Sequence, residues 1–171
     1  MTIRPYKPTD YEQIAALYKQ SNLYGGQFDE NRDSEERLRK RIEADPGAIL
    51  VAEQDGRIVG TVSLIEDGRV AWLFRFAVEQ SEREAEITKA LCDAALVALK
   101  AKGHNQVLVY TPVGNDRLGN RYDSLGFIRG GNFNGDPEWA QIKNDTHKAH
   151  GQLVIRTHSE IMKAAGYSSL K

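Results

Sequence analysis

The stretch that decides the fold runs from Ile49 to Val78 and reads ILVAEQDGRIVGTVSLIEDGRVAWLFRFAV. It contains three apolar segments, rich in β-branched and aromatic residues, that are separated by Asp-Gly pairs at positions 55–56 and 67–68. Asp-Gly is a preferred pair for a tight hairpin turn, because both positions of that turn need a positive φ. The stretch therefore predicts an antiparallel meander of three strands, at Ala48–Glu53, Arg57–Glu66 and Val70–Val78.

Helical periodicity flanks the meander on both sides. Before it, the capping-box spacing of Thr9 and Glu12 opens a helix of about Asp10–Gln20, and a second helix opens at positions 33–36 and reaches about Ala44. After it, Ser81 and Glu84 have the same spacing at the start of the longest predicted helix, Ser81–Lys102. The other predicted elements are strands at Thr2–Arg4, Val107–Tyr110, Phe127–Arg129 and Leu153–Ile155, a helix at Asn115–Leu125 and a short helix at Ser159–Ala165.

Composition and charge exclude several classes of protein. The chain has 171 residues, with 23 Lys and Arg against 24 Asp and Glu, and this balance argues against a nucleic-acid partner. Having a single cysteine, Cys92, excludes an internal disulfide and fits a reducing compartment. We expect Cys92 to lie in the protein core, on the apolar side of the long helix. No apolar run approaches the ~18 residues of a membrane span, and the start has no signal-peptide core. We therefore expect a cytoplasmic protein of the α/β class with no membrane partner.

Three stretches resemble the GNAT superfamily of N-acyltransferases. Residues 49–60 resemble the second and third strands of that family, and Phe76-Ala77-Val78 leads through Arg83 into a long helix as in the family. The most specific stretch matches the family pattern N-x6-Y-x3-G-F through Asn115, Tyr122, Gly126 and Phe127. The resemblance implies a GNAT-like mixed α/β sheet, in which an antiparallel meander precedes a β-α-β-α-β half and two central parallel strands splay apart. It covers residues 1–131, and residues 132–171 are expected to be a C-terminal extension packed on the same domain.

The resemblance also implies a cofactor and a reaction. Acetyl-CoA, or another acyl-CoA, would donate its acyl group to the amine of a small molecule or peptide by direct attack. The backbone N–H of Val78 would polarise the thioester carbonyl, and Tyr122 would protonate the leaving thiolate. For Tyr122 the alternative is a ring packed on the sheet. For Asn115 the structural role is that of a helix N-cap, which is compatible with contact to the cofactor. The cofactor-binding residues that the resemblance implies are Phe76, Ala77, Val78, Arg83, Ala85, Ile87, Thr88, Asn115 and Tyr122.

The diphosphate loop departs from the family pattern Q/R-x-x-G-x-G/A. Arg83 is present, but Glu86 and Thr88 replace the two small residues. A Cβ obstructs the close approach of backbone to phosphate, and the glutamates at positions 79, 82, 84 and 86 crowd the segment with negative charge. Two interpretations remain open. Either acyl-CoA binds with a weakened diphosphate contact, or the fold persists as a catalytically silent module that binds another ligand or partner.

The acceptor side is less defined. Arg75 is a candidate for binding an acidic acceptor, and a paired strand residue is the alternative. Glu53, Glu66 and Tyr110 are possible general bases. No metal site is expected from His147, His150 and His158, and a homodimer is left open. The aromatic residues that would line an acceptor cleft, unless they simply pack a loop against the sheet, are Tyr24, Phe28 and Trp72.

Overall fold

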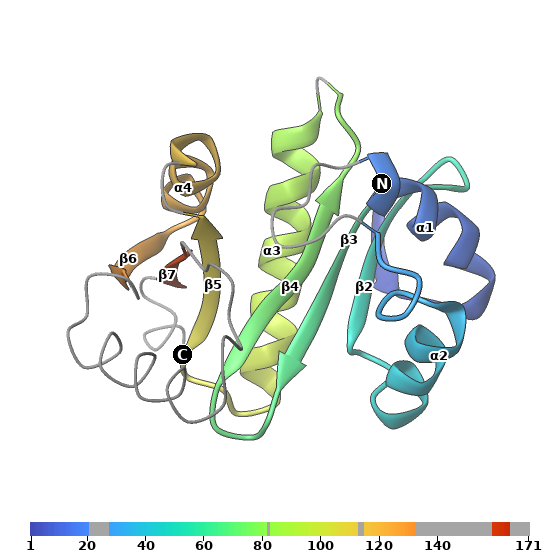
Figure 1. Cartoon of the computed structure of the whole chain (residues 1–171), viewed down its shortest axis with the longest axis horizontal. Coiled ribbons are helices and arrows are strands. Elements are labelled where there is room, and N and C mark those ends of the chain that lie inside the picture. The colour runs from blue at the N-terminus through green and yellow to red at the C-terminus, as the bar shows by residue number, and fades with distance from the viewer. Residues whose placement is uncertain (21–27, 82, 113–114, 133–158, 165–171) are drawn as a thin grey trace, which may run out of the picture. The chain divides into compact units, whose positions relative to one another are not determined.

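The computed structural model describes residues 1–20, 28–81, 83–112, 115–132 and 159–164 (Figure 1). They belong to two compact units, Met1–Val107 and Leu108–Lys171, which are described one after the other.

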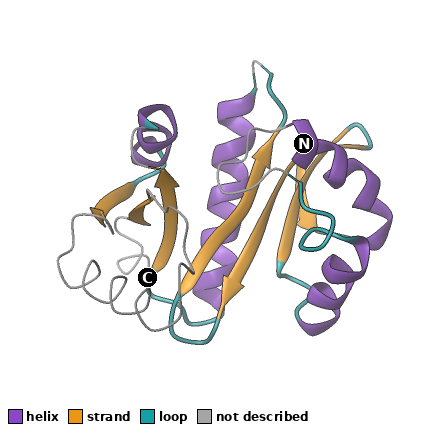
Figure 2. Ribbon diagram, viewed as in Figure 1, coloured by secondary structure: helices purple, strands orange, loops and turns teal. Residues whose placement is uncertain are grey.

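The first unit is a four-stranded antiparallel sheet with helices on both faces (Figure 2). Its strands pair in the order β1-β2-β3-β4, which confirms the predicted meander. The turn between β2 and β3 has positive φ at Asp55 and Gly56, 51° and 76°, as the Asp-Gly pair predicts. The elements are β1 (Thr2–Pro5), a 3-10 turn (Pro8–Asp10), α1 (Tyr11–Gln20), α2 (Glu35–Ala44), β2 (Ile49–Gln54), β3 (Arg57–Glu66), β4 (Ala71–Val78) and α3 (Glu84–Ala101).

The register of the sheet shows which helices cover which face. Val51, Thr61 and Ala77 are cross-strand partners, and Val51 and Ala77 belong to the core cluster that α1 and α2 complete. Gly60 lies one residue away and so faces the other side. There α3 comes so close that a Cβ on Gly60 would meet Leu91 Cδ1 at 2.8 Å. Helix α3 therefore packs on the face opposite to α1 and α2.

The predicted starts of α1 and α2 are confirmed within a residue or two, whereas the capping residues predicted for α1 and the start of α3 are wrong. Ser34 caps α2 by accepting a hydrogen bond from the Arg37 N–H at 3.4 Å. Before α1, the capping box is that of the 3-10 turn, where the Asp10 carboxylate accepts from the Lys7 N–H at 2.8 Å, and it does not consist of Thr9 and Glu12. Helix α3 begins at Glu84, three residues later than predicted, because the Ser81 hydroxyl accepts from the Arg83 N–H within a turn that precedes the helix.

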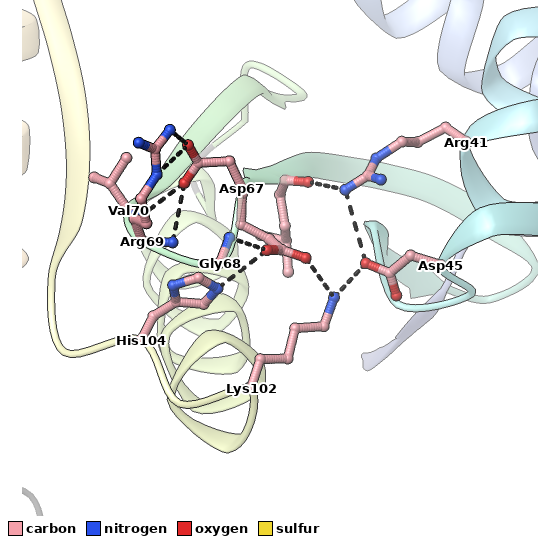
Figure 3. A network of polar contacts seen from close by, with 10 residues as sticks. Arg41, Asp45, Asp67, Gly68, Arg69, Val70, Lys102 and His104 are labelled. Atoms are coloured by element: carbon pink, nitrogen blue, oxygen red, sulfur yellow. Dashed lines mark hydrogen bonds and ion pairs between the residues drawn. The ribbon is translucent and has the colours of Figure 1, made fainter.

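A network of polar contacts joins the end of α3 to β3 and to the segment after α2 (Figure 3). Lys102 pairs with Asp45 and lies 3.9 Å from Glu66. Glu66 also lies 3.4 Å from the buried ring of His104 and accepts from the Gly68 N–H at 3.0 Å. The same network includes Arg41, which donates to the Leu64 carbonyl at 2.9 Å.

The second unit contains β5 (Val107–Pro112, which begins at the boundary), α4 (Asp116–Ser124), β6 (Phe127–Asn132) and β7 (Ser159–Ala164). Strand β7 lies between β5 and β6 and pairs antiparallel with both. The helix predicted at 159–165 is therefore wrong, because hydrogen bonding on two edges outweighs the helix propensity of Glu, Met, Lys and Ala. The predicted strand at 153–155 lies outside the described residues, and the division of the chain at residue 131 stays a prediction.

Candidate active site

Strand β4 carries a β-bulge at Arg75. Thr61 of β3 pairs with Ala77, whereas Ser63 pairs with Phe74, so two residues of β4 lie opposite Val62 alone. Arg75 has a φ of 49°, a left-handed conformation that costs a residue with a side chain about 1–2 kcal/mol. A bulge bends its strand and changes the direction of the groups that follow it. Those groups are Ala77 and Val78, in the segment where the cofactor carbonyl is expected.

A buried ion pair holds the bulge in place. Arg75 donates two hydrogen bonds to Asp33, from Nε to Oδ1 at 2.9 Å and from Nη2 to Oδ2 at 2.6 Å. Both side chains are only 5% exposed, and the guanidinium lies 5.8 Å from the ring centre of Tyr18 and 5.2 Å from that of Phe74. Asp33 precedes the N-cap of α2, so the pair fixes the segment between α1 and α2 to β4. Of the two alternatives for Arg75, the structure contains the paired residue; binding of an acidic acceptor stays a prediction.

The backbone of Val78 points away from β3. The Glu79 N–H donates to the Val59 carbonyl at 2.9 Å, which makes these two residues a hydrogen-bonded pair of the antiparallel ladder. The next pair, Val78 and Gly60, is then of the non-hydrogen-bonded type. In such a pair both residues direct N–H and C=O away from the partner strand. The orientation of the Val78 N–H therefore suits a donor to a group on the other edge of β4.

The start of α3 brings Arg83 against Glu86. Arg83 donates to the two carboxylate oxygens of Glu86, from Nη2 at 2.7 Å and from Nε at 3.0 Å, and its Nη1 donates to Gln54 Oε1 at 2.8 Å. These hydrogen bonds lower the pKa of Glu86, which stays ionised. Glu79 pairs instead with Arg57, at 2.7 Å. The predicted crowding of four glutamates against one arginine is therefore wrong for Glu79, whose charge has its own partner.

The first turn of α3 limits how a ligand can use it. The N–H of Glu84 donates to the Ser81 carbonyl, and that of Ile87 to the Arg83 carbonyl. Side chains at Ile87 and Thr88 are 2% and 4% exposed and face the interior, whereas Ala85 is exposed. Among the described residues, the buried Thr88 hydroxyl has no hydrogen-bond partner, so the threonine that replaces a small residue of the family pattern puts a polar atom in the core. A ligand at this turn would meet Ala85, Glu86 and Arg83 rather than the side chains of Ile87 or Thr88.

In the second unit, the two residues of the sequence pattern that were expected to bind the cofactor have structural roles. Asn115 is the N-cap of α4, and its side chain accepts from the Leu118 N–H at 3.1 Å. Tyr122 is 7% exposed, and its ring meets that of Phe127 edge-on with centroids 5.4 Å apart. The N-cap role of Asn115 is confirmed, and the ring packing of Tyr122 is observed. Their roles toward a cofactor stay predictions.

Two of the three candidate acceptor aromatics, Phe28 and Trp72, lie among the described residues. Phe28 packs on the core cluster of the first unit and lies 4.6 Å from the ammonium of Lys19, which supports its packing alternative. Trp72 is half-buried on β4 opposite Ile65, and Tyr24 lies outside the described residues. Two possible bases are engaged elsewhere, since Glu53 accepts from Arg4 at 2.6 Å and Glu66 belongs to the network of Figure 3.

Two residues of this region were missed from the sequence, Asp33 and Gln54. Each meets its arginine across a long separation in the chain, 42 and 29 residues, which no local pattern encodes. The contact of Arg83 with Glu86 could have been predicted from the sequence, because residues three apart are neighbours on one face of a helix.

Over the described ranges, no three His, Cys, Asp or Glu side chains gather as metal ligands do. In those same ranges no helix combines the length and the apolar character that a membrane span requires. The three histidines at 147, 150 and 158 lie outside the described residues.

Comparison with known proteins decides the family. A model described as the acetyltransferase (GNAT) family matches residues 11–127, more than half of the chain. The chain belongs to the GNAT acetyltransferase family. The match includes the bulged strand, the start of α3, and Asn115 and Tyr122 of α4.

Solved structures agree with this assignment and confirm the predicted fold class. PaiA N-acetyltransferase of Thermoplasma acidophilum, solved in complex with coenzyme A, has a TM-score of 0.70 at 20% identity, covering 96% of this chain and 98% of that one. The ribosomal-protein-S18-alanine N-acetyltransferase of Escherichia coli has a TM-score of 0.65 at 17% identity, over 95% and 92%. An aminoglycoside 6'-acetyltransferase type Ii has a TM-score of 0.64 at 14% identity, over 96% and 97%. These likenesses, all at 20% identity or less, show that the chain has the GNAT fold.

The start of α3 fits a diphosphate in donor type but not in charge. A guanidinium and the N–H groups of a first helical turn are groups that bind phosphate. Glu86 supplies an opposing carboxylate in the same turn and already holds Arg83. An acyl-CoA diphosphate at this place would therefore share Arg83 with Glu86 or displace it.

Proposed function

We propose that this GNAT protein transfers an acetyl or related acyl group from acyl-CoA to the amine of a small molecule or peptide. The observation that carries the proposal is the family match over residues 11–127, which spans the segments expected to hold and activate the donor. Attack is direct, without a covalent enzyme intermediate. When bound, acyl-CoA supplies an acyl group activated as a thioester.

Each residue of the proposed machinery has one task. The Val78 N–H donates to the oxyanion that develops as the amine attacks, and its direction away from β3 supports this role. Arg83 and the N–H of Ala85 attract the diphosphate, while Asn115 binds the amide arm. Tyr122 holds a proton on its phenol oxygen and gives it to the leaving thiolate, and the proton that the amine nitrogen loses goes to solvent, from which the phenolate is reprotonated. The side chains of Ile87 and Thr88 support the turn from the interior.

The acceptor is an amine, and its class is a matter for experiment. The names of the structural neighbours include an alanine of ribosomal protein S18 and an aminoglycoside as acceptors. We therefore propose a panel that contains a peptide with an N-terminal alanine, a lysine peptide with a blocked N-terminus and an aminoglycoside. Full-length protein is incubated with acetyl-CoA and each acceptor, and thiol release and acceptor mass are followed together.

The expected result is thiol release that requires both protein and acceptor, together with an acetylated acceptor. Binding of acetyl-CoA without transfer to any amine in the panel would favour the silent module and count against the proposal. Tyr122→Phe should lower kcat by about 10²–10⁴-fold with little change in cofactor affinity. The matched control is Tyr6→Phe, which removes a buried hydroxyl with no hydrogen-bond partner in the described part of the chain and should leave turnover unchanged. Equal turnover of Tyr122→Phe and wild type would reject the acid role.

A further inference from the structure

The ion pair between Arg83 and Glu86 at the start of α3 occupies the arginine that would bind the diphosphate of acyl-CoA. All three nitrogens of the Arg83 guanidinium donate to protein oxygens, two to the carboxylate of Glu86 and one to the amide of Gln54. The two acidic oxygens thus occupy the face of Arg83 that would clamp a phosphate. The loop cation is neutralised by the same residue that replaces a small one in the family pattern.

The pair is also easily exchanged. Its side chains are 45% and 58% exposed, and ion pairs in water at this level of exposure contribute little to stability. Arg83 can therefore turn to another anion at low cost. The carboxylate of Glu86 would remain in the first turn of α3, and its charge would repel a diphosphate bound there.

We propose that Glu86 is a donor-specificity residue that weakens binding of any donor carrying a diphosphate, by competing for Arg83 and by like-charge repulsion. The proposal rests on the proposed function, since it assumes that acyl-CoA binds at α3. Donors are then held mainly through their amide arm and carbonyl, and their affinity depends less on ionic strength than that of a site with an unopposed arginine.

The test is calorimetric binding of coenzyme A to the full chain, compared between wild type and Glu86→Gln. The substitution keeps the size of the side chain and removes its charge. We expect about tenfold tighter binding, and a steeper loss of affinity with added salt, because the attraction of Arg83 is no longer cancelled. The matched control is Asp93→Asn, which removes a carboxylate of equal exposure, 58%, from an ion pair on the same helix and should leave the affinity unchanged.

A second ligand identifies the group that Glu86 acts on. The 3'-dephospho form of coenzyme A keeps the diphosphate and lacks the terminal phosphate, so the Glu86→Gln gain should be the same for it. A gain that appears with coenzyme A and vanishes with the dephospho form would overturn the assignment to the diphosphate. Equal affinities of wild type and Glu86→Gln would overturn the inference and leave the proposed function standing. Absence of binding in every variant would overturn both.

Discussion

Replacing Asp33 by Asn should destabilise the protein strongly, because it removes the carboxylate to which the buried guanidinium of Arg75 donates two hydrogen bonds. Both side chains are 5% exposed and are joined by hydrogen bonds of 2.9 and 2.6 Å. Removing one partner of such a buried pair costs about 3–5 kcal/mol. At about 2–4 °C per kcal/mol for a chain of this size, the thermal midpoint should fall by roughly 6–20 °C. Circular dichroism during thermal unfolding measures the thermal midpoint.

Two further variants make this result specific. Adding Arg75→Met to Asp33→Asn removes the buried charge and should recover part of the loss. Asp93→Asn breaks an exposed ion pair on α3 and should leave the midpoint unchanged. A fall for Asp33→Asn no larger than that for Asp93→Asn would refute the claim that the pair holds the bulge of β4.

Three other predictions concern the first unit. Burial raises the pKa of Asp10, but hydrogen bonds from Arg4 and the Lys7 N–H outweigh it and hold the pKa below its ordinary value. The stability difference between wild type and Asp10→Asn should therefore be full at neutral pH. It should begin to shrink at about pH 4, where the unfolded carboxylate takes up a proton, and vanish as the pH falls through the lower pKa of the folded state. Urea titrations at several pH values measure the difference, and one that grows in acid has the wrong sign. Burial raises the pKa of Cys92 to about 12, so a thiol reagent at pH 8 should label unfolded but not native protein, and rapid native labelling would contradict this. Gly60→Ala should cost about 1–3 kcal/mol in the same titrations, since its Cβ would meet the side chain of Leu91 at 2.8 Å, and an unchanged midpoint would show that α3 can shift.

Local patterns predicted most of the first unit. Two Asp-Gly pairs between apolar segments predicted the meander, because turn chemistry acts over a few residues. The bulge at Arg75, which shifts the side-chain alternation of β4, was not predicted. The first residues of the helices were predicted less well than the strands. Ser81 and Glu84 have the spacing of a capping box, but the hydroxyl of Ser81 caps a turn before α3 instead of the helix itself.

The site was only partly predictable, for two physical reasons. Asp33 and Arg75 meet because α1 and α2 cover one face of the sheet, which is a property of the fold and not of either segment. Strand β7 has the composition of a helix and becomes a strand because β5 and β6 offer it hydrogen bonds on both edges. By contrast, the contact between Arg83 and Glu86 follows from their spacing alone.

The account depends most directly on whether this chain binds acetyl-CoA at all. The measurement is a calorimetric titration of the wild-type chain with acetyl-CoA, without acceptor and at low salt. The account predicts saturable binding with one site per chain, which coenzyme A competes for. A flat titration up to millimolar acetyl-CoA, with no rise in the thermal midpoint, would contradict it.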